Sequence, residues 1–427
     1  MEFRVYSPSS VQDTANISHH HHHPPTHPDH YSPLVCYSYT LNTILGVGCL
    51  TIPYAVYHAG LVLGLSTVVV MSFLSYVTVL WTCEALERHR RRLHLLSPTS
   101  DDDVEVVTLC RVYLGSIGAN LYHVALYSYG YAVLVAFAQV FIAALSTQFP
   151  ALSSSLAAPF YSLVVVPLSC MDLTEQIVVQ LFLTSVRFAA ITLMTGSLLF
   201  PPTTSSSSDT FSYDVALPLV NFDGLGLLVS TVVFAQFCHM CVPSLIAPLK
   251  KEAAVAAPSI FLAAMTTTTC IYVVLAVLCA ISFGPQTLSS VNLNWSSFPS
   301  MPLVARTFLV LFPAIDTLSS FPLIAINVGN SIEDATSLPK LASRLAAAVP
   351  PILLGYAVND LSTVVHVSGV FGVYLVLIGP ALLQWTSLAS DPEPTRYACM
   401  LSHIGWVYLV LVTGAAAVVI LAAQVVS

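Results

Sequence analysis

The stretch LNTILGVGCLTIPYAVYHAG, residues 41–60, decides the fold of this chain. It is apolar enough to belong to a membrane-crossing helix, yet Gly46, Gly48 and Pro53 stand near its middle. Inside a bilayer no water is present to hydrogen-bond a freed peptide group, so irregular backbone is tolerated only where it is buried in protein or lines a cavity. The stretch therefore predicts either a broken helix at a cavity or close packing of neighbouring helices through glycine.

The composition of the whole chain places this stretch in a membrane protein. Of its 427 residues, 56% are hydrophobic and 8% are charged, whereas soluble domains contain about 25% charged residues. We predict an all-α, polytopic membrane protein. No cleavable signal peptide is expected, because the first apolar run follows a polar N-terminal segment and is longer than the apolar region of such a peptide.

The apolar runs give the number of membrane spans. A helix needs about 20 apolar residues to cross a bilayer, and this criterion predicts about eleven spans. They cover residues 33–58, 61–84, 117–146, 158–171, 176–200, 223–247, 256–283, 302–327, 342–358, 362–386 and 402–426. Two of these, 158–171 and 342–358, are short and contain proline, so we expect them to be tilted or partly buried helices.

The basic residues predict the orientation in the membrane. With the N-terminus in the cytosol, every Lys and Arg except Arg187 and Arg306 falls in a cytosolic segment, as the positive-inside rule requires. An odd number of spans then places the C-terminus outside or in a lumen. Asn294, in the pattern Asn-Trp-Ser, lies in an outer loop and is a candidate for glycosylation.

The segments outside the spans are polar. Residues 1–32 predict a disordered cytosolic tail, and residues 33–427 the transmembrane domain. The histidine run at 19–23 fits an expression tag or a native low-complexity tract, and the nearby His27 and His30 favour the tract. The loop at 88–103 carries a basic cluster followed by an acidic one, which favours an orientation signal beside anionic lipid headgroups over a partner site.

The sixth predicted span is also interrupted. Pro243 removes the backbone hydrogen bond to the carbonyl of His239, four residues earlier. Two interrupted helices five spans apart are typical of transporters that consist of two inverted five-helix halves. No sequence identity between the two halves is visible, so spacing alone supports this repeat.

Four motifs follow one another along the chain. They are NTILGVG with LTIPYA at 42–48 and 50–55, His239 with Pro243, SSFPL at 319–323, and LSTV, SG and GP between 361 and 380. In this order they resemble the amino acid/auxin permease (AAAP) superfamily of amino acid transporters, over about residues 33–426. Within it, ARTF at 305–308 and LFP at 311–313 are most similar to the transmembrane protein 104 branch.

The resemblance implies a leucine-transporter-like fold, with an inverted-repeat core of five plus five helices and one extra helix. It also implies secondary active transport of an amino acid, driven by Na⁺ or H⁺ through alternating access. The residues implied to contact the substrate are Leu45, Gly46, Val47, Gly48, Cys49, Phe234, Phe237 and His239. Those implied to hold the ion are Asn42, Gly46, Ser319 and Ser320, although the two serines could instead hydrogen-bond to their own helix.

Ionisable residues within the spans are further candidates, because their burial in a membrane is costly. Arg187 lies about 16 Å into the fifth span, and Asp316 about 21 Å into the eighth from the opposite side. These depths predict an Arg187–Asp316 ion pair, which could be a structural link or a gate. His239 could carry a coupling proton or be a hydrogen-bonded core histidine. Glu84, at the cytosolic end of the second span, is expected to extend toward the interface.

Two functions remain open at this point: an amino acid transporter, and a transporter-like sensor that binds an amino acid without appreciable flux. We expect no enzyme, because neither an activated nucleophile nor a nucleotide loop is visible. Cys238 and Cys241 share a helix face, but two further ligands are not evident, so no metal site and no cofactor beyond the coupling ion are expected.

The expected partners are an amino acid and membrane lipids, with no nucleic acid, and a monomer is expected. The apolar Ile44, Val47 and Phe234 weakly favour a neutral amino acid. The membrane could be the plasma membrane or that of a lysosome or vacuole.

Overall fold

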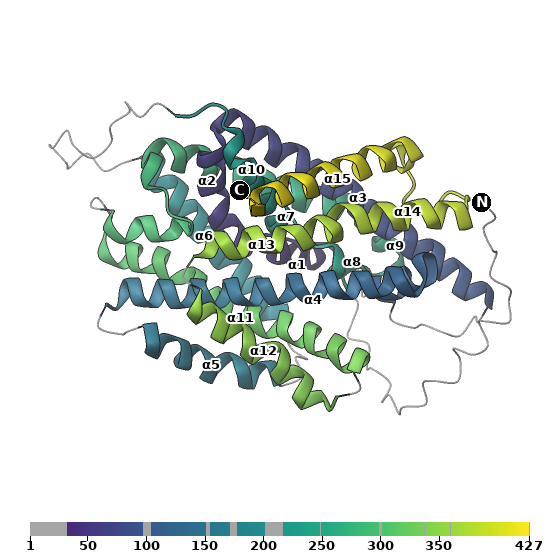
Figure 1. The fold of residues 1–427 in the computed structure, drawn as a ribbon, viewed down its shortest axis with the longest axis horizontal. Helices are drawn as coiled ribbons and strands as arrows, with labels where there is room; N and C mark the ends of the chain where they lie inside the picture. The colour runs from purple at the N-terminus through teal and green to yellow at the C-terminus, as the bar shows by residue number, and fades with distance from the viewer. Residues whose placement is uncertain are drawn as a thin grey trace.

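The structure is a computed structural model that describes residues 32–96, 104–150, 154–170, 177–200, 217–247, 249–298, 301–336, 338–358 and 360–426. The regular elements of these segments are all helices. The long helices run mostly along one axis of the molecule (Figure 1). The predicted disordered tail lies outside the described residues, apart from Ser32.

The helices correspond to the predicted spans. In the described segments, eight helical spans are long and apolar enough to cross a membrane, and the bent pair α1 (Pro33–Ile44) and α2 (Gly48–Ala59) makes up to nine. The eight are α3 (Leu61–Leu96), α4 (Val106–Gln148), α6 (Ile177–Leu199), α7 (Leu225–Ala235) with α8 (Val242–Ile246), α10 (Ala257–Phe283), α11 (Leu303–Thr336), α13 (Leu361–Val373) with α14 (Gly379–Ser390), and α15 (Ile404–Val426). The two short predicted spans are α5 (Ser154–Cys170) and α12 (Lys340–Ala357), which do not meet that test.

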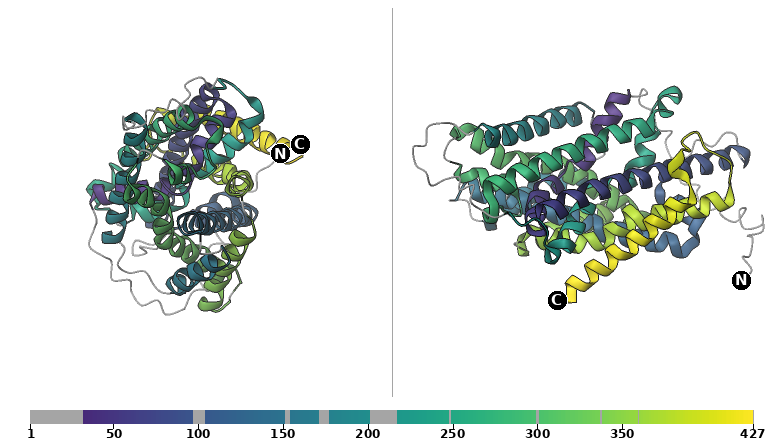
Figure 2. Two further views of the ribbon diagram at one scale, coloured as in Figure 1. Left: turned by 90° about the vertical axis from the view of Figure 1, so that its left-hand side faces the viewer. Right: turned by 90° about the horizontal axis from the view of Figure 1, so that it is seen from above.

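The packing has the symmetry that the spacing of the two breaks predicts. Helices five spans apart lie against each other: α2 against α7, α3 against α10, α4 against α11, and α5 against α12. Figure 1 shows α11 and α12 beside α4, with α5 next to them. The eleventh helix, α15, packs on α7, α13 and α14 and lies along one edge of the molecule (Figure 2). This is the arrangement of an inverted five-plus-five repeat with one added helix.

A buried polar network corrects the expectation for Glu84. Its side chain is fully buried, and its carboxylate lies 2.8 Å from Nη2 of Arg88, one helical turn along α3. Glu84 also accepts hydrogen bonds from Gln384 and Ser402, and Arg88 donates to Gln384 and Ser387, both at 3.0 Å. The prediction that Glu84 extends to the interface is therefore wrong: its charge is matched inside the protein, where it joins α3 to α14.

The predicted glycosylation site lies in a short 3₁₀ helix, Val291–Ser297. The side-chain amide of Asn294 donates to the carbonyl of Gln286 at 2.8 Å, and its oxygen accepts from the amide of Leu288 at 3.0 Å. Modification of Asn294 remains a prediction and would replace one of the two hydrogens on its side-chain nitrogen.

Candidate functional site

The break in the first span lies where the glycines predict it. α1 ends at Ile44, α2 begins at Gly48, and the two helices are bent by 51°. The ends of two helices therefore meet inside the protein. The last carbonyls of α1 and the first amides of α2 have no partners within their own helices.

The sixth span is broken at the same level. α7 ends at Ala235, a 3₁₀ turn occupies His239–Cys241, and α8 starts at Val242 with Pro243 in its first turn. Proline is compatible with that position because it has no N–H to leave unpaired. The sequence thus ends one half-helix and starts the next within a few residues.

The two glycines of the first break have different roles. A Cβ atom at Gly48 would lie 2.7 Å from Cα of Ala235, so glycine is required where the two broken spans touch. A Cβ atom at Gly46 would meet no atom within 4 Å. Both alternatives in the sequence, close packing and a cavity, are therefore present, at different glycines.

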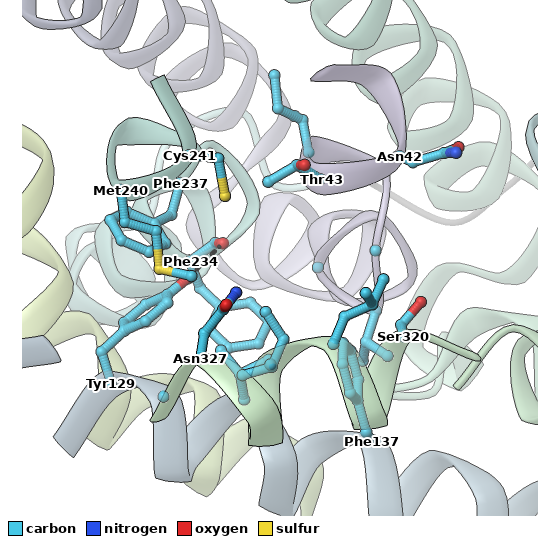
Figure 3. Close-up of a pocket in the computed structure, with 18 of the residues that line it drawn as sticks. Asn42, Thr43, Tyr129, Phe137, Phe234, Phe237, Met240, Cys241, Ser320 and Asn327 are labelled. Carbon is cyan, nitrogen blue, oxygen red and sulfur yellow. Dashed lines mark hydrogen bonds between the residues drawn. The ribbon is translucent and has the colours of Figure 1, made fainter. Parts of the chain in front are cut away.

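A cavity of about 280 Å³ lies against both breaks (Figure 3). α4 contributes Tyr129 and Phe137 to its wall, and α11 contributes Ser320 and Asn327. The remaining lining residues are Tyr39, Asn42, Thr43, Ile44, Gly46, Val47, Gly48, Leu126, Gly130, Val133, Arg187, Phe234, Phe237, Met240, Cys241, Ser244, Leu245, Leu323, Ile324 and Val328. The wall is mainly apolar, with a few polar groups from α1 and α11.

The cavity extends from the breaks toward one end of the bundle. Tyr39 lies in α1 before its break, and Leu245 lies in α8 after the break in the sixth span. Asn327 lies in the C-terminal part of α11. Because Tyr39 precedes the break, this part of the cavity lies on the side of the break where α1 begins. On the opposite side of the first break, a small space of about 10 Å³ lies beside Phe312 and Pro313.

Seven of the eight predicted substrate contacts line one of these two spaces. Gly46, Val47, Gly48, Phe234 and Phe237 line the cavity. Leu45 and Cys49 instead face the small space on the other side of the break.

His239 is not among the residues that line the cavity. Its side chain is 1% exposed, and Nε2 lies 2.8 Å from Oγ1 of Thr78 on α3. His239 begins the 3₁₀ turn that follows the end of α7. Of the two interpretations given by the sequence, this geometry is that of a hydrogen-bonded core histidine.

Tyrosine and serine hydroxyls cover the carbonyls that the two breaks expose. The hydroxyl of Tyr272 lies 2.9 Å from the carbonyl oxygen of Ile44 and 3.0 Å from that of Ala235, the last residues of α1 and α7. Tyr129 donates to the carbonyl of Phe234 at 2.9 Å. Ser75 donates to that of Gln236 at 3.2 Å. Sequence reasoning missed these contacts, because a tyrosine in an apolar span reads as a packing residue.

Removal of the hydroxyl of Tyr272 is expected to loosen both breaks. Tyr272→Phe leaves two buried carbonyls without this donor, which costs about 1–3 kcal/mol of stability. Thermal unfolding of the purified protein in detergent measures the loss. Tyr161→Phe is the matched control, since Tyr161 is equally buried but its hydroxyl makes one bond of 3.4 Å. Equal losses in the two variants would show that Tyr272 does not link the breaks.

The predicted ion pair forms the polar edge of the cavity. Nη2 of Arg187 lies 2.7 Å from Oδ1 of Asp316 and 2.8 Å from Oδ2. Nη1 donates to the side-chain and main-chain oxygens of Asn42, the latter at 3.2 Å. Ser320 accepts from Nη2 at 3.4 Å. The side chain of Ser319, the other predicted ion ligand, lies outside the described part of the structure.

Three kinds of comparison with known proteins found matches to this chain. The model of a family described as "Transmembrane amino acid transporter protein" matches residues 36–426. Transmembrane protein 104 of Mus musculus is 21% identical over 89% of this chain and 94% of its own length. A Caenorhabditis briggsae homolog of transmembrane protein 104 is 25% identical over 71% of this chain and 68% of its own length.

A solved structure supports the fold. MhsT, crystallised in complex with L-phenylalanine, superposes with a TM-score of 0.59 and 11% sequence identity, covering 93% of this chain and 99% of its own. At that identity the likeness concerns the fold alone. The inverted-repeat, leucine-transporter-like core expected from the sequence is confirmed.

Proposed function

The chain belongs to the transmembrane amino acid transporter family, and from this we propose that it is a secondary active transporter that moves an amino acid across a membrane by alternating access. The observation that carries the proposal is the cavity at the two broken spans. Its volume of about 280 Å³ is near the lower end of the range for small-molecule sites, which is about 300–1,000 Å³. A single amino acid fits such a space.

The helix ends at the cavity match the two charged groups that all free amino acids carry. The N-terminal end of α2, at Gly48, presents the positive end of a helix dipole, which favours the carboxylate. The C-terminal end of α1, at Ile44, presents the negative end, which favours the ammonium group. Both ends border the same cavity, so one zwitterion could satisfy both.

The remaining wall favours a neutral side chain on the substrate. Phe137, Phe234 and Phe237 give it an aromatic surface, and Leu323 and Ile324 extend this with aliphatic groups. Among the described lining residues, Arg187 alone has a permanent charge, and Asp316 balances it. A charged substrate side chain would find no counterion there.

The direction of the cavity suggests that this structure represents the cytosol-facing step of the transport cycle. If the N-terminus is cytosolic, as the basic residues predict, the end where α1 begins faces the cytosol and the cavity extends toward that side. The C-terminus then lies outside or in a lumen. We propose a monomer in the plasma membrane or in a lysosomal or vacuolar membrane, with substrate movement coupled to a cation.

Flux in proteoliposomes tests the proposal. The purified protein is reconstituted, and uptake of individually radiolabelled neutral L-amino acids is measured under inward Na⁺ and H⁺ gradients. We expect saturable uptake of at least one of them, with competition by the unlabelled compound. Saturable binding to the detergent-solubilised protein without flux under any gradient would replace the transporter by the amino acid sensor.

A further inference from the structure

Oxygen atoms from two helices surround the guanidinium of Arg187 beside the first break. The oxygens nearest the guanidinium of Arg187 are the main-chain and side-chain oxygens of Asn42, the carboxylate of Asp316 and the hydroxyl of Ser320. Carbonyl, carboxylate and hydroxyl oxygens are the hard ligands that metal cations such as Ca²⁺ and Mg²⁺ select in proteins, and half-helix carbonyls coordinate Na⁺ in transporters with broken spans. Asn42 lies two residues before the end of α1, where the helix dipole also favours positive charge. Both the oxygen atoms and the C-terminal end of α1 therefore favour a cation between them.

The guanidinium fills this place. The side chain of Arg187 is 4% exposed, so these oxygens, rather than water, stabilise its positive charge. Thr184, one turn earlier on α6, donates to the side-chain oxygen of Asn42 at 2.8 Å and orients that residue toward Arg187. A second cation among the same oxygens would stand beside the guanidinium and be repelled by it.

The arginine also links the elements that a bound ion would link. Through Asn42 and Asp316 it joins the half-helix before the first break to α11, with its own backbone on α6. A free ion would have to bind in each transport cycle to connect these helices, whereas the guanidinium of Arg187 is covalently attached to the protein.

We propose that Arg187 is the resident cation of the site formed by Asn42, Asp316 and Ser320, and that this site therefore takes no sodium ion. The inference rests on the proposed transport function and adds to it. It excludes Na⁺ as a coupling ion that binds at this site. It gives Arg187 a positioning role, since the residue acts through the geometry of α1.

Binding of radioactive ²²Na⁺ to the purified protein in detergent tests the proposal without requiring flux. We expect no saturable binding to the wild type. Arg187→Ala leaves the oxygen ligands and a space, so it should gain saturable Na⁺ binding, and Arg187→Ala/Asp316→Asn should lose it again. Arg306→Ala is the control, because Arg306 lies in α11 outside this cluster.

Saturable Na⁺ binding to the wild type that Asp316→Asn abolishes would overturn the proposal. So would an Arg187→Ala variant that folds, as judged by its elution as a single detergent-solubilised species, but gains no Na⁺ binding. Should Arg187→Ala fail to fold, Arg187→Lys preserves a cation at the site. Saturable Na⁺ binding to that variant would count against the proposal, and its absence would support it.

Flux gives a second, separate readout. Replacement of Na⁺ by choline should leave wild-type uptake within about twofold of its original rate, and a loss of more than about tenfold that Asp316→Asn abolishes would overturn the proposal, because it would locate a required Na⁺ at this site. Arg187→Ala should be slow in choline and recover in part when Na⁺ or guanidinium chloride is added. If no amino acid is transported at all, the transport function fails, but the Na⁺-binding result still decides the role of Arg187.

Discussion

Gly46→Leu is expected to lower amino acid flux by at least about 100-fold, the size of effect that follows from misplacing a bound substrate by an ångström. A Cβ atom at this position meets no atom within 4 Å, and Gly46 lines the cavity at the two broken spans. Gly46 does not have the positive φ that would make leucine strained. Folding should therefore survive while the space for the substrate is lost.

Proteoliposome flux, with the amount of inserted protein measured in parallel, checks this expectation. Gly196→Leu is the matched control, since a Cβ at Gly196 also meets nothing within 4 Å, but this residue lies in α6 away from the cavity. Both variants should insert and elute like the wild type. Wild-type flux in Gly46→Leu would mean that the substrate passes elsewhere.

Arg88→Met is expected to cost about 3–5 kcal/mol of stability, because it leaves the carboxylate of Glu84 buried without its cation. Arg88 is 1% exposed and Glu84 is fully buried. Unfolding of the purified protein in mixed micelles measures the loss. Arg92→Met, an exposed position on the same helix, should change stability by no more than about 0.5 kcal/mol.

The double variant Glu84→Gln/Arg88→Met separates loss of the ion pair from loss of packing. Removing both charges leaves no buried ion, so the double variant should be more stable than Arg88→Met alone. If the effects of the two single substitutions simply add, Glu84 and Arg88 do not stabilise each other, and the network contributes little.

The sequence predicts most of the fold because the bilayer limits what a span can be. Length and apolar composition locate the spans, while Gly46, Gly48 and Pro243 mark the breaks. Arg187 and Asp316 could be paired from depth alone, since few partners exist for a charge in the middle of a membrane.

Other features could be found only in the structure, because the sequence pattern at these residues fits more than one arrangement. Glu84 and Arg88 are four residues apart and so share a helix face, but at the end of a span such charges are equally consistent with an interfacial position. For His239, the direction of the side chain depends on the turn after the break. The 3.6-residue period of an α-helix does not apply there. The contact of Tyr272 with both breaks joins residues that are far apart in the chain.

The positive charge of Arg187 also bears on which cellular force can drive transport. A sodium ion that travels with its cargo carries one elementary charge through the membrane potential, which is worth about 2.3 kcal/mol per 100 mV. An arginine returns with the protein, and a zwitterion has no net charge, so a cycle without an accompanying proton is electrically silent. It forgoes the roughly 50-fold accumulation that 100 mV would provide. Accumulation of the amino acid then requires a cation bound elsewhere than among Asn42, Asp316 and Ser320, and a proton that travels with the zwitterion would supply the charge on which the membrane potential acts.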